Sequence, residues 1–373
     1  MDFIAVTGTN GKTTCTYWIR HLLGGKKVGV IGTLCAFVGD KEIAYTAPKL
    51  TTPDARQLDE IIAKMRDMGV ETVVMEASAH GIAQKRLYTV ARKSDGVDGE
   101  NGADGAWSVG SPLPIRVGVF TNLTQDHLDF FGTMENYARV KADFFMGDQV
   151  QVAVINADDA VGQDIIKRRV WGLRPYFSGR NFTETNANAC VEVAREMGVC
   201  ERKIRRRLKN LPNVAGRFNV FKMKNGATVI VDYAHTPDGL DKILTAARAM
   251  VDVRIGNLIA VFGCGGNRDT TKRPIMGQIA SEKSDYIVIT SDNPRNEPPA
   301  DIMREIEAGV KGVPYRMIED RAQATRFAID MARAGDVVVI AGKGAEVTQE
   351  IAGVFYPYSD LEIVAKYIVR RRR

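Results

Sequence analysis

Short apolar runs alternate with amphipathic stretches through almost the whole chain of 373 residues. The runs, such as residues 3–6 and 258–262, have the length of buried strands, whereas the stretches between them repeat apolar residues at helical spacing. Strands that alternate with helices form parallel sheets that are covered by helices on both faces. The fold class that this pattern predicts is therefore α/β.

The alternation divides into two units. The strands expected in the first unit are residues 3–6, 28–31, 72–75, 117–121 and 152–155, with helices at 15–23, 53–68 and 133–146. The strands expected in the second unit are residues 228–231, 258–262, 286–290, 315–318 and 337–340. Two helical stretches, 186–197 and 201–211, lead to the turn signal Pro212-Asn213. We place a domain boundary there, between residues 1–212 and 213–373.

One segment, residues 93–114, interrupts the first unit. It is rich in glycine and aspartate and has no periodicity. Such a composition cannot bury enough apolar surface to offset the entropy of ordering. The segment is predicted to be a mobile surface loop without a catalytic role.

Composition narrows the class of protein further. Hydrophobic residues make up 45% and charged residues 26%, and no apolar run approaches the length of a membrane span, which predicts a soluble protein. The first residues form a strand rather than a signal peptide. The five cysteines lack C-x-x-C spacing, which argues against a zinc site or a disulfide framework and favours a reducing cytoplasm.

The net charge of +6 comes largely from two arginine runs, residues 205–207 and 370–373. Neither run is interleaved with aromatic residues, and no nucleic-acid motif accompanies them. A solvated helix face and a frayed tail are therefore preferred to a nucleic-acid surface.

The stretch TGTNGKTT at residues 7–14 lies between an expected strand and an expected helix. Backbone N–H groups of such a loop point at the mouth of a helix N-terminus and bind a triphosphate. Lys12 is expected to reach the β- and γ-phosphates and Thr13 the Mg²⁺. The strict motif has glycine where this chain has Val6, so a glycine turn with a solvated lysine is the alternative. The flanking strand and helix favour the phosphate loop. Its expected ATP-binding residues are Gly8, Thr9, Asn10, Gly11, Lys12, Thr13 and Thr14.

Further polar groups follow the expected strands, at the edge where open α/β sheets bind ligands. Glu76 lies at the end of an expected strand near the phosphate loop, and a carboxylate in this position is a natural ligand for Mg²⁺. His127 follows another strand, and its spacing alone leaves a metal ligand and a hydrogen-bonded structural histidine equally open.

The second unit carries two similar groups. Asp232 and His235 follow one strand, and the glycine-rich GCGGNRD at 263–269 follows the next. Arg295, in SDNPR, and Glu346, in GKGAE, would together suit a zwitterionic amino acid, with the arginine forked onto a carboxylate. An ion pair of Arg295 that only shapes its loop is the alternative.

These motifs together resemble those of the ATP-dependent Mur ligases, most closely the type that adds a diamino acid to a muramoyl dipeptide. The matching stretches run in the family's order: TGTNGKTT, LTTPDA, MEASAHG, TNLTQDHLDFFGTMENY, AGRF, DYAHTPDGL, FGCGGNRDTTKRP, SDNPR and GKGAE. The resemblance implies a central ATP-binding domain of the phosphate-loop type with a parallel sheet, followed by a C-terminal Rossmann-like domain.

The resemblance also implies a reaction. A substrate carboxylate attacks the γ-phosphate of ATP, and the incoming amine then attacks the acyl phosphate to form an amide. Two anions must approach each other, so Lys12 and two Mg²⁺ ions would offset their repulsion. By family likeness, Thr13 and Glu76 hold the first ion and His127 the second, and Lys141 matches a carbamylated lysine that becomes an oxygen ligand.

Family likeness assigns the remaining site residues. Four face ATP: Asn186, Arg217, Asp232 and His235. Four hold the peptide-bearing substrate: Thr51, Thr52, Ser78 and Arg86. Five bind the amino acid: Asp292, Asn293, Arg295, Gly342 and Glu346. The Asp-Asn-Pro-Arg sequence resembles that of enzymes that select meso-diaminopimelate, in which the arginine pairs with the distal carboxylate of this amino acid. Lysine lacks that carboxylate, so an arginine at this position would disfavour it.

The chain departs from the family pattern in several places. The phosphate loop begins at Thr7, without the family's uridine-binding domain before it, and the region from Ile155 to Asn186 is shorter. Ala345 and Ala79 replace a histidine and a serine. We expect an active ligase whose muropeptide is held without uridine contacts, or with a uridine-binding domain from a separate protein. Alternatives are a ligase of another peptide or polymer, as in cyanophycin synthesis, and a nonenzymatic ATP-binding subunit.

Overall fold

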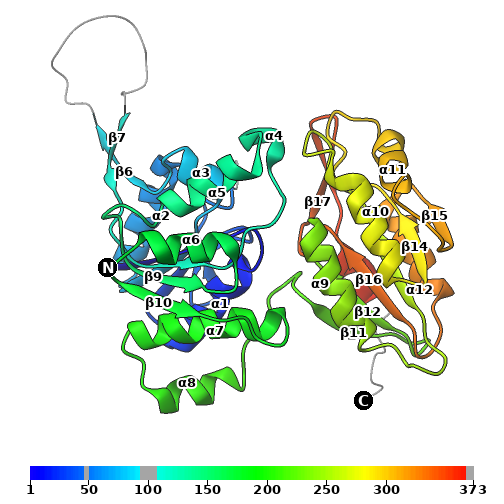
Figure 1. Ribbon diagram of the computed structural model, residues 1–373, viewed down its shortest axis with the longest axis horizontal. Coiled ribbons are helices and arrows are strands. Elements are labelled where there is room, and N and C mark those ends of the chain that lie inside the picture. Colours follow the sequence, from blue (N-terminus) through cyan, green and yellow to red (C-terminus); the bar gives the residue numbers. More distant parts are fainter. Residues whose placement is uncertain (46–49, 93–106, 367–373) are drawn as a thin grey trace, which may run out of the picture. The chain divides into compact units, whose positions relative to one another are not determined.

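The computed structural model describes residues 1–45, 50–92 and 107–366, so the arginine run at 370–373 lies outside the described residues. The chain forms two compact units (Figure 1). The first consists of Met1–Leu123 and Glu135–Pro212, and the second of Thr124–Met134 and the chain from Asn213 onward. Each unit has its own sheet with helices packed on it, so the predicted α/β class is confirmed.

The first sheet is parallel at its centre. Its strands, in spatial order, are β10 (Leu173–Tyr176), β9 (Val150–Asn156), β8 (Ile115–Phe120), β1 (Asp2–Thr7), β5 (Thr72–Glu76), β2 (Val28–Ile31), β3 (Ala36–Val38) and β4 (Lys41–Glu42). All five expected strands are present. The sheet also has an antiparallel edge that the sequence did not predict, where β3 pairs with β2 and with β4. The short turns between β2, β3 and β4 leave no room for the crossover that parallel pairing needs.

Helices lie between the strands of this unit. They are α1 (Lys12–Leu23), α2 (Ala55–Asp67), α3 (Ala79–Ala83), α5 (Met134–Asp143), α6 (Ala160–Arg168), α7 (Phe182–Glu196) and α8 (Glu201–Leu208). The start of α2 is fixed by Asp54, whose side chain accepts a hydrogen bond from the Gln57 backbone N–H. The short helix α4 (Leu128–Phe131) belongs to the segment grouped with the second unit.

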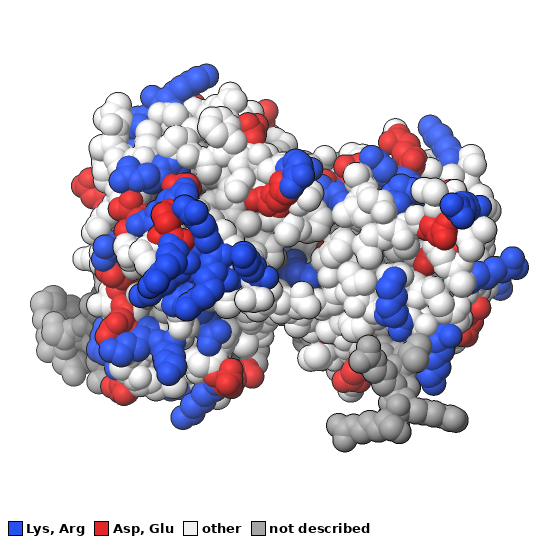
Figure 2. All heavy atoms as spheres, turned by 90° about the horizontal axis from the view of Figure 1, so that it is seen from below, with Lys and Arg blue, Asp and Glu red and all other residues white. Residues whose placement is uncertain are grey.

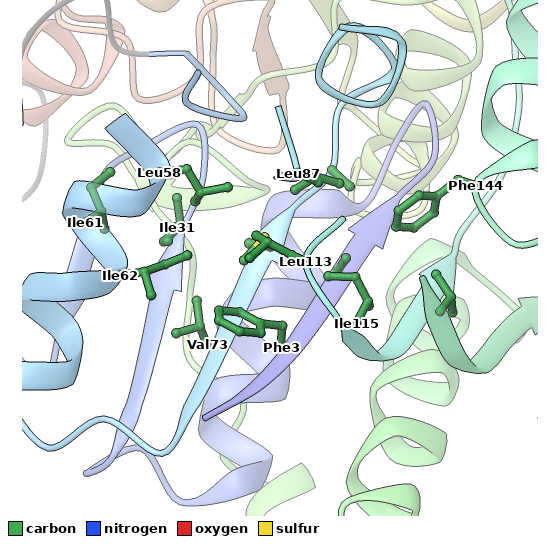
Figure 3. Close-up of a cluster of buried hydrophobic side chains, with 14 of the residues drawn as sticks. Phe3, Ile31, Leu58, Ile61, Ile62, Val73, Leu87, Leu113, Ile115 and Phe144 are labelled. Carbon is green, nitrogen blue, oxygen red and sulfur yellow. The ribbon is translucent and has the colours of Figure 1, made fainter. Parts of the chain in front are cut away.

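The core of the first unit lies between α2 and the sheet (Figure 3). Leu58, Ile61 and Ile62 share one face of α2 because they recur at helical spacing. They pack toward Ile31 of β2 and Val73 of β5, and all five side chains are buried. Burial of each such side chain contributes roughly 1.5–3 kcal/mol. This packing fixes the strand whose end carries Glu76.

The segment predicted to be a loop at 93–114 is a strand in part. Trp107–Pro112 forms β7, which pairs antiparallel with β6 (Tyr88–Arg92); residues 93–106 lie outside the described residues. The Thr89 hydroxyl accepts a hydrogen bond from the Ser111 backbone N–H at 3.0 Å. The loop prediction was wrong here because pairing with a partner strand satisfies the backbone, which local composition does not reveal.

Helix α8 carries the arginine run at 205–207. Only Ile204 of this helix is buried, while Arg205 and Arg206 are exposed. Arg207 instead turns inward and donates to the Leu22 carbonyl. Figure 2, viewed from the side on which α8 lies in Figure 1, shows a dense group of Lys and Arg on the first unit. The solvated-face interpretation agrees with this exposure, and the absence of a nucleic-acid partner stays a prediction.

The second sheet is parallel except at one edge. Its strands, in spatial order, are β11 (Asn219–Lys222), β12 (Thr228–Asp232), β16 (Val337–Ala341), β13 (Leu258–Phe262), β14 (Tyr286–Ile289) and β15 (Tyr315–Met317). Only β11 runs antiparallel. The helices are α9 (Pro237–Arg248), α10 (Lys272–Lys283), α11 (Pro299–Glu307), α12 (Arg321–Met331) and α13 (Asp360–Ala365). A separate hairpin, β17 (Thr348–Ile351) with β18 (Val354–Pro357), follows β16.

A buried ion pair joins α12 to α13. The Arg321 guanidinium donates to both carboxylate oxygens of Asp360, from Nε at 3.2 Å and Nη2 at 2.9 Å, and both side chains are fully buried. Nη2 also donates to the Ala341 carbonyl at the end of β16. Burial acts to lower the pKa of Arg321, but the Asp360 carboxylate outweighs it and raises that pKa. The pair thus anchors the strand end from which residues 342–346 emerge.

Removing the acidic partner should destabilise the second unit. We expect Asp360→Asn to cost about 3–5 kcal/mol, because the buried Arg321 guanidinium loses the charge of the carboxylate that accepts its two side-chain hydrogen bonds and keeps only the more distant Asp292, at 3.8 Å. The urea midpoint of that unit, followed by circular dichroism, measures the loss. Asp330→Asn, at an exposed position of α12, is the matched control and should change stability by less than about 0.5 kcal/mol. An unchanged midpoint for Asp360→Asn would contradict the assignment.

Within the described parts of the chain, no helix combines the length and the apolar character that crossing a membrane requires.

Candidate functional site

The loop at residues 7–14 runs from β1 into α1, the strand and helix that the phosphate-loop interpretation requires. Gly11 is the N-cap of α1 and has φ 89°, a left-handed conformation that favours glycine. A Cβ at Gly11 would lie 2.6 Å from Oδ1 of Asn186 on α7. The structure therefore brings Asn186, predicted to face ATP, against the loop.

Two residues at the end of β8 brace this loop. The Asn10 backbone N–H donates to Oδ1 of Asn122 at 3.0 Å, and the Thr9 N–H donates to the Asn122 carbonyl at 2.9 Å. The Thr121 hydroxyl donates to the Asn10 carbonyl at 2.7 Å. The sequence analysis assigned no role to Thr121 or Asn122. Their position after a strand that neighbours β1 was the available signal.

Lys12 lies at the first position of α1, and its side chain folds back over the loop. Its ammonium donates to the carbonyls of Gly8 at 2.9 Å and Thr9 at 2.8 Å. Thr13, next to it, is buried, and Thr14 is partly buried. The loop thus combines an ammonium with the partly positive end of a twelve-residue helix. This arrangement suits an anion such as a triphosphate.

Glu76 ends β5, directly beside the loop. The sheet register pairs it with Val6, the residue before Thr7. Its carboxylate is buried, and both oxygens accept hydrogen bonds from Thr33, one from the backbone N–H at 2.9 Å and one from the hydroxyl at 3.0 Å. Among the described residues it has no ion-pair partner. Sequence reasoning missed Thr33, because nothing in the spacing of residues 33 and 76 connects them.

This setting suits a Mg²⁺ ion. A buried carboxylate without a protein counter-ion favours a cation, and Mg²⁺ takes few protein ligands beside phosphate oxygens and waters. Among the described residues, no three His, Cys, Asp or Glu side chains gather as a metal cluster. A site that uses Glu76 and the Thr13 hydroxyl does not need such a cluster. The ligand roles of both residues stay predictions.

Lys141 lies on α5 and is almost fully buried, with 1% of its surface exposed. Its Nζ donates to the Thr7 hydroxyl at 3.1 Å, at the first residue of the loop. The ammonium also lies 5.1 Å from the ring centre of Tyr137, whose hydroxyl hydrogen-bonds to that of Thr9 at 3.0 Å. A lysine that was expected to act beside the phosphates therefore contacts the loop that would hold them.

The four residues expected to hold the peptide-bearing substrate lie near the end of β5, where the Thr52 hydroxyl is 2.8 Å from the Glu76 carbonyl. The Thr52 hydroxyl donates to Oγ of Ser78 at 3.0 Å and accepts from the Ser78 N–H at 2.8 Å. Arg86 donates to the Thr52 carbonyl at 2.9 Å, and Thr51 hydrogen-bonds to Thr33 at 3.1 Å. Burial lowers the pKa of Arg86. Thr52, Ser78 and Arg86 thus contact one another, whereas Thr51 contacts Thr33, and the role of all four in binding stays a prediction.

His127 lies in the segment Thr124–Met134, which is grouped with the second unit, whereas Thr13, Glu76 and Lys141 lie in the first. Its Nε2 is 3.4 Å from Oδ2 of the buried Asp126. That carboxylate also lies 3.5 Å from His235 and 3.3 Å from Lys272. Burial acts to raise the pKa of Asp126, but the hydrogen bond to His235 and the charge of Lys272 hold it well below its usual value. Both interpretations of His127 remain open.

The groups expected at the nucleotide in the second unit lie together at the end of β12. Asp232 accepts hydrogen bonds from the backbone N–H groups of Phe218 at 2.7 Å and Ala234 at 2.8 Å, and burial raises the pKa of its carboxyl. The Arg217 guanidinium stacks on the Tyr233 ring at 4.3 Å. Nδ1 of His235 lies 2.8 Å from the carbonyl of the same tyrosine.

The groups expected at the amino acid lie where β14 and β16 end. Asn293 donates from Nδ2 to Oε2 of Glu346 at 3.0 Å, and the buried Lys343 donates to the same oxygen at 2.6 Å. Gly342 approaches Asp292 so closely that a Cβ would lie 2.6 Å from its Oδ2. Burial acts to raise the pKa of Asp292, but the Lys343 and Arg321 charges outweigh it and lower that pKa.

Arg295 is held from two sides in this group. Its Nε lies 3.1 Å from Oε2 of Glu350, and its Nη1 donates to the Gly266 carbonyl at 2.8 Å. Arg295 has φ 53°, and its backbone N–H donates to the Glu350 carbonyl at 3.1 Å. The ion pair that the sequence analysis left as an alternative is therefore present. Glu350 was not among the predicted site residues, and the substrate role of Arg295 stays a prediction.

Both units match known protein families. Residues 6–96 and 99–221 match the Mur ligase middle domain, and residues 216–344 match the glutamate ligase domain of Mur ligases. The chain belongs to the Mur ligase family. The resemblance inferred from the motifs is thereby confirmed, and with it the family's use of ATP.

Relatives within the family have closely related sequences. A UDP-N-acetylmuramoyl-L-alanyl-D-glutamate–2,6-diaminopimelate ligase of Aquifex aeolicus is 37% identical over 99% of this chain and 77% of its own length. The enzyme of the same name from Coxiella burnetii is 36% identical over 98% of this chain and 78% of its own length. A solved structure of such a ligase matches with a TM-score of 0.59 and 31% identity, covering 99% of this chain and 78% of that one.

The fold is also found in a more distantly related protein. The structure of E. coli FolC in complex with ADP matches with a TM-score of 0.63 at 18% identity, covering 91% of this chain and 86% of that one. At this identity the likeness concerns the fold alone.

Proposed function

We propose that this Mur ligase joins 2,6-diaminopimelate to UDP-N-acetylmuramoyl-L-alanyl-D-glutamate with hydrolysis of ATP to ADP and phosphate, a step of peptidoglycan synthesis. The observation that carries the proposal is identity of 37% with such a ligase over nearly the whole chain. The phosphate loop of β1 and α1 and the charged residues after β14 and β16 support it, because the reaction needs a nucleotide site and an amino-acid site.

The reaction divides into two displacements. The acceptor carboxylate attacks the γ-phosphorus of ATP, ADP leaves, and an acyl phosphate remains. The amine of diaminopimelate, after losing a proton, attacks the acyl carbon, and inorganic phosphate leaves. In the first step Lys12 and the loop N–H groups hold the phosphates and reduce the repulsion between the two anions. Asn186, Arg217, Asp232 and His235 are proposed to hold the rest of the nucleotide.

Two Mg²⁺ ions are proposed to assist. When bound, Mg²⁺ supplies positive charge that offsets the approach of carboxylate and phosphate. Thr13 and Glu76 would hold one ion, and His127 with a carbamylated Lys141 the other. Thr33 fixes the orientation of Glu76 through two hydrogen bonds. A lysine can serve as an oxygen ligand only after carbamylation, because an ammonium repels a metal ion.

Diaminopimelate is proposed to be the meso isomer, selected by Arg295. The guanidinium offers paired donors to a carboxylate, which lysine does not have at its side-chain end. Thr51, Thr52, Ser78 and Arg86 are proposed to bind the muramoyl peptide. We place the reaction in the cytoplasm, where ATP is available; the five cysteines are free thiols, as reducing compartments favour.

Arg295→Ala should weaken use of meso-diaminopimelate. We expect kcat/KM for this amino acid to fall about 5- to 150-fold, which corresponds to about 1–3 kcal/mol for a charged hydrogen bond left unmade. Steady-state release of ADP at varied meso-diaminopimelate measures it. Arg304→Ala on α11, which removes an exposed arginine, is the matched control. Equal kcat/KM in Arg295→Ala and the control would refute the role.

The proposal as a whole is tested by supplying the substrates singly and together. With ATP, Mg²⁺, the UDP-linked dipeptide and meso-diaminopimelate, mass spectrometry should detect the UDP-linked tripeptide, with one ADP for each amide. Omission of either the dipeptide or the amino acid should abolish the product. ADP release without any amide product from the complete mixture would contradict the proposal.

A further inference from the structure

We propose that helix α8 docks the protein on an anionic lipid surface through its basic face. Five residues form this basic face: Arg202, Lys203, Arg205, Arg206 and Lys209. The contact is peripheral, because the cations meet the negative headgroups and no segment has to enter the hydrocarbon layer. The inference goes beyond the proposed function and does not depend on it, since lipid binding needs neither a nucleotide nor a muropeptide.

Helical spacing places the five cations on one side of α8. Arg202 and Arg206 are one turn apart, as are Arg205 and Lys209, whereas the buried Ile204 lies on the opposite side. All five residues of the basic face are exposed. The dense group of Lys and Arg in Figure 2 lies on the side of the first unit where Figure 1 shows α8. The helix therefore presents a broad positive surface to solvent.

The C-terminal end of α8 is fixed to α1. The Arg207 guanidinium donates to the Leu22 carbonyl, and Nε2 of His21 lies 3.0 Å from the Arg207 carbonyl. Just after the helix, Nε1 of Trp18 donates to the Pro212 carbonyl at 3.0 Å. The backbone that carries the basic face is therefore ordered before any partner binds, which lowers the entropic cost of docking.

The charges of the basic face are not neutralised within the described parts of the chain. None of the five side chains makes an ion pair or a hydrogen bond there, and Glu201, the acidic residue of α8, pairs with Arg195 of α7 at 2.6 Å. Other exposed arginines do pair with carboxylates: Arg56, Arg116, Arg168, Arg180, Arg248 and Arg304. Like charges one turn apart destabilise a helix. An anionic partner would remove this repulsion.

The composition of α8 favours lipid headgroups over other polyanions. Residues 201–210 contain no aromatic side chain. Proteins that bind single-stranded nucleic acids stack bases on aromatic rings, and protein interfaces use aromatic and apolar anchors at their centre. The basic face offers neither. An anionic lipid layer presents continuous negative charge, so cations alone are sufficient to bind it.

Five cations predict a weak and reversible attachment. Each Lys or Arg near an anionic membrane strengthens binding about fivefold. Because the side chains are exposed, salt screens them: the Debye length falls from roughly 10 Å at 0.1 M to roughly 3 Å at 1 M ionic strength. Binding should therefore be clear at low salt and lost at high salt.

Co-sedimentation of the full chain with lipid vesicles tests the proposal. One set of vesicles contains phosphatidylglycerol and phosphatidylcholine in equal parts, and the other contains phosphatidylcholine alone. We expect binding to the first set only, with release as the ionic strength rises from about 0.1 M to about 1 M. No binding to the phosphatidylglycerol vesicles at low salt would overturn the proposal, and so would equal binding to both sets.

A triple variant assigns the binding to α8. Arg202→Gln, Arg205→Gln and Arg206→Gln combined should lower the partition constant for the phosphatidylglycerol vesicles on the order of a hundredfold. Removing like charges one turn apart should keep or raise the helix content seen by circular dichroism, so unfolding would not explain the loss. Unchanged lipid binding in this variant would refute the role of α8.

A matched control removes the same charge elsewhere. It combines Lys224→Gln, Arg254→Gln and Lys311→Gln, three exposed cations of the second unit, and should bind the vesicles like the unmodified protein. Equal losses in the two triple variants would mean that net charge, and not the basic face, determines binding. In direct competition, a preference for random RNA or for polyglutamate over the vesicles would assign the basic face to a nucleic acid or an acidic protein and overturn the proposal.

Discussion

Replacing Lys12 with alanine should lower kcat/KM for ATP about 10²- to 10³-fold, the cost of losing one preorganised donor to the transferring phosphate. Lys12 lies at the first position of α1, and its ammonium group donates to the Thr9 carbonyl of the loop at 2.8 Å. The loop N–H groups and the end of α1 remain in the variant. Nucleotide binding should therefore weaken less than turnover.

The measurement combines steady-state ADP release with a fluorescence titration of bound nucleotide. Lys26→Ala is the matched control, because Lys26 is an exposed lysine just after the same helix. Its kinetics should equal those of the unmodified protein. Full turnover in Lys12→Ala would mean that residues 7–14 are an ordinary glycine turn.

Replacing Lys141 with alanine should lower turnover by on the order of 10²-fold, because a metal ion that loses a ligand loses several kcal/mol of stabilisation. A short carboxylic acid added to the assay should restore part of the activity by occupying the space of the carbamate. The buried Nζ of Lys141, 3.1 Å from the Thr7 hydroxyl, lies next to the phosphate loop where this oxygen would act.

The carbamate can also be detected directly, by carbon-13 NMR. Protein treated with carbon-13 bicarbonate should give a carbamate resonance that is absent from Lys141→Ala. Lys167→Ala, an exposed lysine of α6, is the control and should keep both the resonance and the activity. If Lys141→Ala keeps full turnover, or the resonance persists, the carbamate is not at this residue.

The central strands of both sheets could be predicted from sequence because they are buried on both faces. The runs at 258–262 and 337–340 are continuous apolar segments for this reason. The edge strands β4, β10 and β11 were missed, since an exposed face replaces apolar residues with polar ones. Strand β3 is apolar and buried, but its three residues are too short a run to indicate a strand. The hairpin β17–β18 is exposed over most of its length, so its pattern gave no signal either.

The phosphate loop and the strand-end groups could also be predicted, because parallel strands end at one edge of a sheet. The partners that orient these groups could not. Thr33 is 43 residues before Glu76, and Glu350 belongs to a hairpin that was not foreseen. Lys272 contacts Asp126 across 146 residues, which places Thr124–Met134 with the second unit although the chain on both sides of it belongs to the first. Such contacts depend on the tertiary fold.

The central claim is that the acceptor carboxylate becomes an acyl phosphate before the amide forms. An acceptor labelled with oxygen-18 in that carboxylate tests it most directly, with the released phosphate analysed by mass spectrometry. An acyl phosphate loses its bridging oxygen to phosphate when the amine attacks, so one labelled oxygen should appear in each phosphate. Amide formation with unlabelled phosphate would contradict the account.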